Sequence, residues 1–116
     1  MITIYHYPKC SKSRAGLCEI EKQNDSIEIR NYFKDLFTRE ELISVLNKLN
    51  RKPLDLVRTN ESIWKEHFSE KKLTDECIID ALLQFPQLIE RPIVVFNENA
   101  VIARPTEKIN ELLLHF

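Results

Sequence analysis

Residues 1–31 read MITIYHYPKCSKSRAGLCEIEKQNDSIEIRN, and this stretch decides the fold of the chain. Residues 1–7 place isoleucines on one side and Thr or Tyr on the other, a pattern typical of a short strand, which Pro8 then ends. Residues 11–24 contain no proline and mix apolar with charged residues, which indicates a helix that begins near Ser11. Residues 26–31 alternate again and predict a second strand. Two strands joined through a helix form a βαβ unit, in which the strands pair in parallel through a right-handed crossover.

The remaining residues predict a helical block, a hairpin and a final helix. Within about residues 38–85, Thr38 forms a capping box with Glu41, while Pro53 and Thr74 begin two further helices. Residues 92–96 and 101–103 are apolar runs separated by the turn residues 97–99, which predicts a hairpin. Thr106 is expected to cap the last helix. We therefore predict an α/β fold with a mixed four-stranded sheet, in the thioredoxin-like order βαβ, helical insert, ββα. Residues 1–116 are expected to form a single domain, with the insert at about 38–85.

The composition excludes several classes of function. The 116 residues carry 17 Lys plus Arg against 18 Asp plus Glu, and this balance argues against nucleic acid as a partner. Gly16 is the only glycine, so the sequence holds no glycine-rich phosphate-binding loop. Its apolar runs are far shorter than the ~20 residues of a membrane helix, and its first residues lack the pattern of a secretory signal. We therefore expect a cytoplasmic protein that binds neither nucleic acid nor a membrane.

The three cysteines, Cys10, Cys18 and Cys77, have neither the even number of a disulfide framework nor the spacing of a zinc site. We therefore expect reduced thiols and no bound metal. Cys18 follows Cys10 by eight residues, or ~12 Å along a helix, which exceeds the reach of a disulfide. Cys18 and Cys77 are interpreted as core or half-buried thiols.

Cys10 falls directly before the helix that begins near Ser11. Open backbone amides and the positive end of the helix dipole stabilise a thiolate at such a position. Positive charge is added by three neighbours, Lys9, Lys12 and Arg14. The sequence therefore predicts a reactive thiol with a lowered pKa.

Four stretches, in order along nearly the whole chain, resemble the glutaredoxin-coupled arsenate reductase family. They read Tyr5-His6-Tyr7-Pro8-Lys9-Cys10-Ser11-Lys12-Ser13-Arg14, Leu56-Val57-Arg58, Arg91-Pro92-Ile93-Val94 and Arg104-Pro105. The resemblance implies a thioredoxin-like fold and an active site of one nucleophilic cysteine and three anion-binding arginines, which map onto Cys10, Arg58, Arg91 and Arg104. It further implies that glutathione and glutaredoxin act as reductants and that no cofactor is bound. Arginine suits this site because its fork of N–H donors binds tetrahedral oxyanions such as arsenate bidentately.

The resemblance also assigns the residues around this site. His6 matches the family's active-site histidine, while Ser13 and Arg14 match its first helical turn and are assigned to substrate binding. Pro92 matches the proline that thioredoxin-like proteins hold in the cis form, facing the active cysteine.

Two other functions stay open from the residues alone. One is a regulatory or binding module of the Spx type, although Ser13 stands where Spx proteins carry the second cysteine of a C-x-x-C switch. The other is a glutathione-dependent reductase of a different substrate. A phosphatase-type arsenate reductase is excluded, because it needs C-x5-R and the spacing from Cys10 to Arg14 is C-x3-R.

Overall fold

The computed structural model describes residues 2–23, 26–68 and 72–115. The chain divides into two compact units: unit 1 contains Met1–Asp35 and Arg91–Phe116, and unit 2 contains Leu36–Glu90. The predicted insert falls within unit 2. That residues 1–116 form a single domain stays a prediction.

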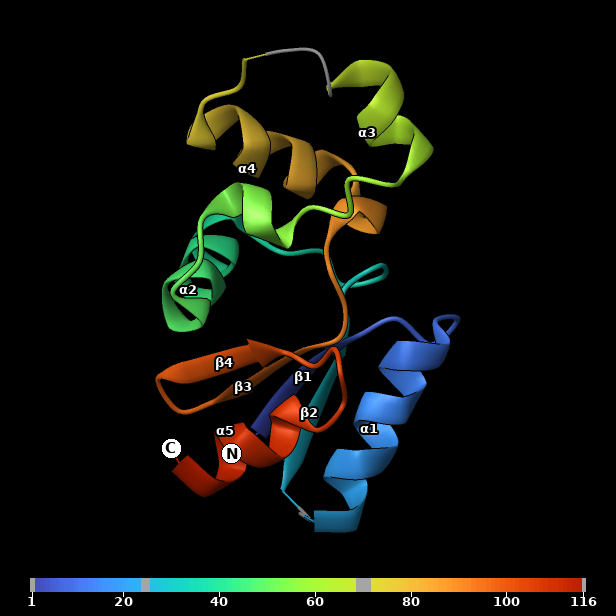
Figure 1. Cartoon of the computed structure of the whole chain (residues 1–116), viewed down its shortest axis with the longest axis vertical. Helices are drawn as coiled ribbons and strands as arrows, with labels where there is room; N and C mark the ends of the chain where they lie inside the picture. The colour runs from blue at the N-terminus through green and yellow to red at the C-terminus, as the bar shows by residue number, and fades with distance from the viewer. Residues whose placement is uncertain (1, 24–25, 69–71, 116) are drawn as a thin grey trace. The chain divides into compact units, whose positions relative to one another are not determined.

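Unit 1 is built on a mixed sheet with the strand order β2-β1-β3-β4 (Figure 1). Its elements are β1 (Ile2–His6), α1 (Ser11–Gln23), β2 (Ile27–Asn31), β3 (Ile93–Phe96), β4 (Asn99–Ile102) and α5 (Lys108–His115). β1 pairs in parallel with β2 and antiparallel with β3, so that Ile4 lies between Ile29 and Val94. β3 and β4 form the hairpin. The predicted α/β class and the thioredoxin-like mixed four-stranded sheet are therefore confirmed.

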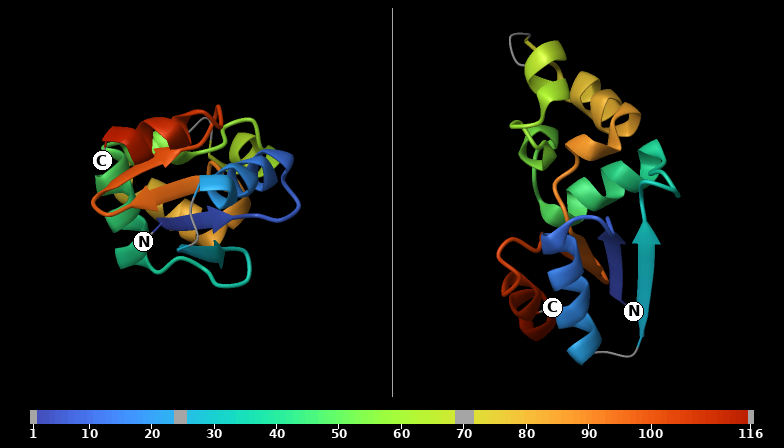
Figure 2. Two further views of the ribbon diagram at one scale, coloured as in Figure 1. Left: turned by 90° about the horizontal axis from the view of Figure 1, so that it is seen from below. Right: turned by 90° about the vertical axis from the view of Figure 1, so that its right-hand side faces the viewer.

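Helices α1 and α5 cover one face of this sheet, as the right-hand view of Figure 2 shows. The core beneath them is a cluster of buried residues from the sheet and both helices, made of Ile2, Ile4, Ile20, Val94, Ala103, Ile109 and Leu112. Alternate side chains of a strand point to the same face. His6 therefore continues the buried series of Ile2 and Ile4 to the end of β1, next to the turn that carries Cys10.

In the described part of unit 2, all the regular secondary structure is helical. The elements are α2 (Arg39–Leu49), η1 (Pro53–Leu56), α3 (Ser62–His67), α4 (Asp75–Gln84) and η2 (Pro86–Leu88), of which η1 and η2 are 3-10 helices. α2 begins with the predicted capping box of Thr38 and Glu41. α4 begins where the Thr74 hydroxyl accepts the N–H of Cys77, also as predicted. None of the helices in the described ranges of the chain has the length and apolar character needed to cross a membrane.

Two element boundaries differ from the sequence-based expectation. The hairpin turn is limited to Asn97 and Glu98, because Asn99 already pairs with Phe96. Asn97 adopts a left-handed φ of 57°, which asparagine tolerates better than most residues. α5 begins at Lys108, after a turn in which the carbonyl of Thr106 accepts the N–H of Ile109 at 3.0 Å. A cap by the Thr106 side chain stays a prediction.

Candidate active site

Cys10 lies in the turn between β1 and α1, immediately before the first residue of the helix. Its N–H donates to the carbonyl of Tyr7 at 3.0 Å, and its carbonyl accepts the N–H of Arg14, also at 3.0 Å. These two bonds close the turn and place the thiol at the helix N-terminus. The side chain is half-buried, so it remains accessible to a small reactant.

The surroundings of the Cys10 thiol favour the thiolate. Burial raises its pKa, but the backbone N–H groups of Ser13 and Lys12 and the guanidinium of Arg91 outweigh burial and lower the pKa to about 7. In addition, Nη2 of Arg104 donates to Sγ at 3.7 Å. The lowered pKa predicted from the helix position is therefore confirmed, and Arg91, distant in the sequence, contributes to it.

Arg91 and Arg104 are joined to each other as well as to Cys10. Nε of Arg104 donates to the backbone carbonyl of Arg91 at 2.7 Å. Each arginine precedes a cis proline, Pro92 and Pro105 respectively. The cis form of Pro92 confirms the prediction from the resemblance. The cis form of Pro105 was missed, although the repeated Arg-Pro pair was the signal that could have suggested it.

An aromatic pair holds the guanidinium of Arg91. The rings of Tyr7 and Phe33 stack with centroids 3.9 Å apart and planes inclined by 10°. Cζ of Arg91 lies 4.9 Å from the centroid of Tyr7 and 6.0 Å from that of Phe33, within the range of cation–π attraction. Burial lowers the pKa of Arg91, but its contacts with Cys10 and Tyr32 raise it above the ordinary value. Arg91 is therefore a permanent cation that is only 8% exposed.

Phe33 was not among the predicted site residues. The carboxyl ends of parallel strands meet at one edge of a sheet, so residues just after β1 and just after β2 come together. Tyr7 follows β1 directly, and Phe33 lies two residues beyond β2. This relation in the sequence was the signal that could have identified the pair.

His6 and Ser13 form a buried polar pair behind the Cys10 turn. Nδ1 of His6 lies 2.7 Å from Oγ of Ser13, and the same oxygen accepts the N–H of Tyr7 at 2.9 Å. Burial of the His6 ring lowers its pKa, and the charge of Arg14 acts in the same direction. A neutral ring fits this pair, because the single proton of the Ser13 hydroxyl can be donated to Nδ1 while its oxygen accepts from Tyr7.

Arg14 is exposed, and its Nη1 donates to the carbonyl of Pro8 at 2.9 Å. The structure thus joins Arg14 to the turn before Cys10. Arg58 belongs to unit 2, where its N–H donates to the carbonyl of Leu88 at 2.7 Å and its Nε lies 3.2 Å from Oε1 of Glu61. Substrate binding by Ser13, Arg14 and Arg58 stays a prediction.

The only glycine of the chain lies where α1 approaches Pro92. A Cβ added to Gly16 would lie 2.8 Å from Cγ of Pro92, closer than real contacts allow. Gly16 therefore lets the helix that begins after Cys10 pack against the proline that follows Arg91. This contact helps to fix the two halves of the candidate site.

The interpretation of Cys18 and Cys77 as core or half-buried thiols was wrong, because both are exposed. On α1 the buried residues Ser13, Gly16 and Ile20 follow helical spacing, and Cys18 projects from the opposite side. Cys77 lies in the first turn of α4, off the face that its buried residues Ile78, Ile79, Ala81 and Leu82 form. Within residues 2–23, 26–68 and 72–115, no cluster of three or more His, Cys, Asp or Glu side chains could hold a metal ion.

Comparisons with known proteins show which proteins this chain is similar to. The chain is 37% identical over 113 residues to an arsenate reductase of Escherichia coli, covering 97% of this chain and 80% of that protein. It is 34% identical over 116 residues to the uncharacterized protein YfgD of the same organism, covering 97% and 96%. The structure of an arsenate reductase from Vibrio cholerae superimposes with a TM-score of 0.89 at 36% identity, covering 95% of each chain. The model of the ArsC family matches residues 5–112, and the chain belongs to this family.

Proposed function

We propose that this protein reduces arsenate to arsenite with glutathione and glutaredoxin as reductants. One observation carries the proposal: a thiol with a pKa of about 7, Cys10, is in contact with two guanidinium groups, those of Arg91 and Arg104. A nucleophilic thiolate in contact with fixed positive charges suits an anionic substrate. The arsenate reductases among its relatives support arsenate as that substrate.

The arginines are proposed to bind the oxyanion. Each guanidinium keeps its charge at any physiological pH and presents a planar fork of donors to two oxygens. Arg91 and Arg104 supply two such groups beside Sγ, and the family resemblance adds Arg58. The same charges offset the repulsion between an anionic thiolate and an anionic substrate and stabilise the charge that builds during attack.

The Cys10 thiolate attacks arsenic, so that an S–As bond forms and one oxygen leaves as hydroxide, which takes a proton from solvent to become water. Glutathione thiolate then attacks Sγ of Cys10. The S–S bond forms, the S–As bond breaks, and its electron pair stays on arsenic, which is reduced from As(V) to As(III). Two thiolates are oxidised to one mixed disulfide, which balances the two electrons. Glutaredoxin restores Cys10 by thiol–disulfide exchange.

The remaining residues of the resemblance are proposed to position this chemistry. His6 holds Ser13, and the N–H of Ser13 contacts the Cys10 thiolate. Arg14 fixes the turn through the carbonyl of Pro8. We place the reaction in the cytoplasm, where reduced glutathione is available.

The test is arsenate reduction in the presence of glutathione and glutaredoxin, with Cys10→Ser compared with wild type. We expect Cys10→Ser to lose turnover. Cys18→Ser and Cys77→Ser are matched controls, because each removes an exposed thiol outside the site and should keep wild-type turnover. Arsenate reduction by Cys10→Ser at the wild-type rate would contradict the proposal. Loss of turnover in Cys18→Ser would show that an internal thiol, rather than glutathione, supplies the second sulfur.

A further inference from the structure

Unit 1 contains a cavity beside the turn that carries Cys10. Its volume is about 320 Å³, within the ~300–1,000 Å³ range of small-molecule sites. It is lined by Tyr7, Pro8, Lys9, Asn31, Phe33 and Lys34. These residues come from the turn after β1 and from the turn after β2, and Lys9 is the direct chain neighbour of Cys10.

The lining combines an apolar wall with two cations. The stacked rings of Tyr7 and Phe33 belong to the wall, and the same rings carry the guanidinium of Arg91. Lys9 and Lys34 are both exposed, so their ammonium groups are accessible to a ligand. The cavity therefore offers aromatic surface and two positive charges next to the nucleophile.

The turn after β2 is fixed by hydrogen bonds. Oδ1 of Asn31 accepts the N–H of Phe33, and its backbone carbonyl accepts the N–H of Lys34, both at 3.1 Å. The neighbouring carboxylate of Asp35 is engaged by Nε of Arg30 at 3.3 Å. The hydrogen bonds thus fix the backbone at Lys34. The adjacent carboxylate, that of Asp35, already has a cationic partner in Arg30.

We propose that this cavity binds glutathione and presents its thiol to Cys10; the inference rests on the proposed function, because it locates the reductant of that reaction. Glutathione is a tripeptide thiol with two carboxylates, which match the two ammonium groups of Lys9 and Lys34. Its peptide planes can lie against the rings of Tyr7 and Phe33. The cysteine of glutathione is its central residue, and Cys10 directly follows Lys9 in the chain, so a tripeptide bound in this cavity lies beside the turn that carries the thiolate.

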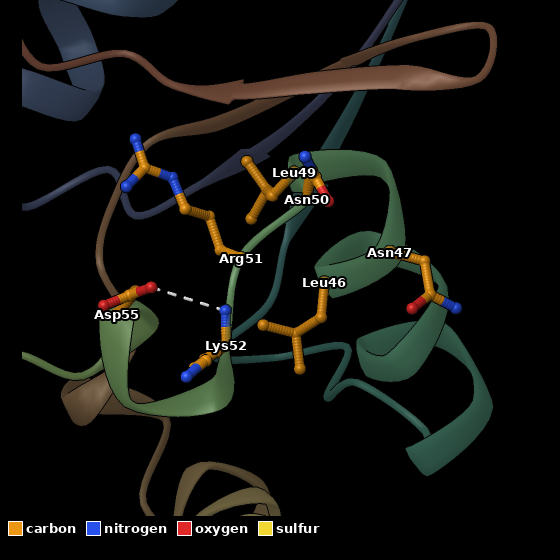
Figure 3. Close-up of a pocket in the computed structure, with 7 residues that line it drawn as sticks. All are labelled: Leu46, Asn47, Leu49, Asn50, Arg51, Lys52 and Asp55. Atoms are coloured by element: carbon orange, nitrogen blue, oxygen red, sulfur yellow. Dashed lines mark hydrogen bonds between the residues drawn. The ribbon is translucent and has the colours of Figure 1, made fainter.

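A larger cavity in unit 2 does not fit this ligand. It has a volume of about 710 Å³ and includes Arg51, Lys52 and Asp55 in its lining (Figure 3). Oδ2 of Asp55 accepts the backbone N–H of Lys52 at 3.3 Å, so a carboxylate already occupies part of this wall. Its lining contains no cysteine, and no step of the proposed reaction requires it.

The proposal is tested by thiol–disulfide exchange at Cys10, which needs no arsenate. Oxidised glutathione converts the Cys10 thiolate to the mixed disulfide and releases one glutathione thiolate. The neutral bis(2-hydroxyethyl) disulfide undergoes the same exchange without the charges that the cavity would recognise. The ratio of the two rate constants, followed by mass spectrometry of the Cys10 peptide, therefore reports recognition of glutathione separately from the reactivity of the thiolate.

Lys34→Glu is the informative variant, since Lys34 is exposed and lies 24 residues from Cys10 in sequence. We expect it to lower the ratio of the rate constant for oxidised glutathione to that for bis(2-hydroxyethyl) disulfide by up to about fivefold. This change corresponds to the upper range for one exposed ion pair. Lys22→Glu makes the same charge change on the last turn of α1 and should leave the ratio unchanged. In the arsenate assay, Lys34→Glu should raise the KM for glutathione and leave the KM for arsenate unchanged.

An unchanged ratio in Lys34→Glu, or equal slowing of both disulfides, would overturn the glutathione site. The first result would show that Lys34 does not recognise the tripeptide, and the second that it acts on the thiolate instead. Failure of the proposed function gives a different result. In that case the wild-type protein does not reduce arsenate, while the dependence of the ratio on Lys34 persists.

Discussion

At the scale of single residues, the reactivity of Cys10 is a balance of opposing effects. Partial burial favours the neutral thiol, whereas the N–H groups of Ser13 and Lys12 and the charge of Arg91 favour the thiolate. The second set prevails, and the pKa falls to about 7. The nucleophile is therefore about half ionised at neutral pH, without a neighbouring group that must first remove its proton.

The first prediction follows from this pKa. Alkylation of Cys10 by iodoacetamide should rise with pH and reach half its maximal rate near pH 7, because only the thiolate reacts. A free cysteine with an ordinary pKa of ~8.5 is only a few per cent ionised at this pH. At pH 6–7 we expect Cys10 to be labelled before Cys18 and Cys77, although both of these are exposed. Mass-spectrometric mapping measures this order, and preferential labelling of either other cysteine would contradict it.

The second prediction concerns the arginine that lies between Cys10 and the aromatic pair. Arg91→Ala removes both a hydrogen bond and a positive charge from the thiolate, so the pKa of Cys10 should rise by about one unit. Arg91→Lys should restore part of the shift, because it keeps the charge and loses the planar fork. The pH dependence of alkylation measures the midpoint, with Lys22→Ala as a control for the loss of a distant charge. An identical midpoint in wild type and Arg91→Ala would show that the backbone amides alone stabilise the thiolate.

At the scale of elements, helix α1 contributes to the site with both its N-terminus and its buried face. Its N-terminus supplies the amides that contact Cys10, and its buried face carries Ser13 and Gly16. Gly16 costs helix stability in isolation, but its missing Cβ makes room for the ring of Pro92. Packing of the helix against Pro92 therefore couples the position of Cys10 to that of Arg91.

The third prediction tests this packing. Gly16→Ala should gain ~0.5–1 kcal/mol from helix propensity and lose ~1–3 kcal/mol from overpacking, so we expect a net loss of about 1–2 kcal/mol in the free energy of unfolding. It should also raise the KM for arsenate. Ala15→Gly is the reverse substitution at the neighbouring exposed position, and should cost about 1 kcal/mol while leaving that KM unchanged. Urea unfolding and steady-state kinetics measure both effects. A Gly16→Ala protein more stable than wild type would show that the proline ring moves aside without cost.

The elements that sequence could predict are those with local signals. The change from alternating to helical spacing located β1, α1 and β2, and the side chains of Thr38 and Thr74 marked the starts of two helices. The stack of Tyr7 on Phe33 depends on parallel pairing of β1 with β2, so no local pattern encodes it. The exposure of Cys18 was missed because a cysteine is usually buried, and only the position of the buried stripe on α1 shows which side it occupies.

At the scale of the whole molecule, the residues that the family resemblance implies for the active site fall in different units of the chain. Cys10, Arg91 and Arg104 belong to unit 1 and Arg58 to unit 2. Within unit 2, Val57 and Ile89 form a β-bridge, so the segment that carries Arg58 is hydrogen-bonded to the segment that leads into Arg91. This bridge fixes the end of the long insertion between β2 and β3, just before the chain re-enters unit 1.

The last prediction tests whether unit 2 contributes to oxyanion binding, as the family resemblance implies. If Arg58 binds arsenate, Arg58→Ala removes a charge-assisted contact worth about 1.5–3 kcal/mol, which corresponds to a loss of roughly 10- to 150-fold in kcat/KM. Arg58→Lys should recover only part of this loss. Arg51→Ala is the matched control from the same unit, because Arg51 is exposed and no step of the reaction is assigned to it. The pH midpoint of Cys10 alkylation should stay near 7 in both variants, since the contacts that set it all belong to unit 1. Wild-type kinetics in Arg58→Ala, together with losses in Arg91→Ala and Arg104→Ala, would confine the oxyanion site to unit 1 and leave the ion pair with Glu61 as the role of the Arg58 side chain.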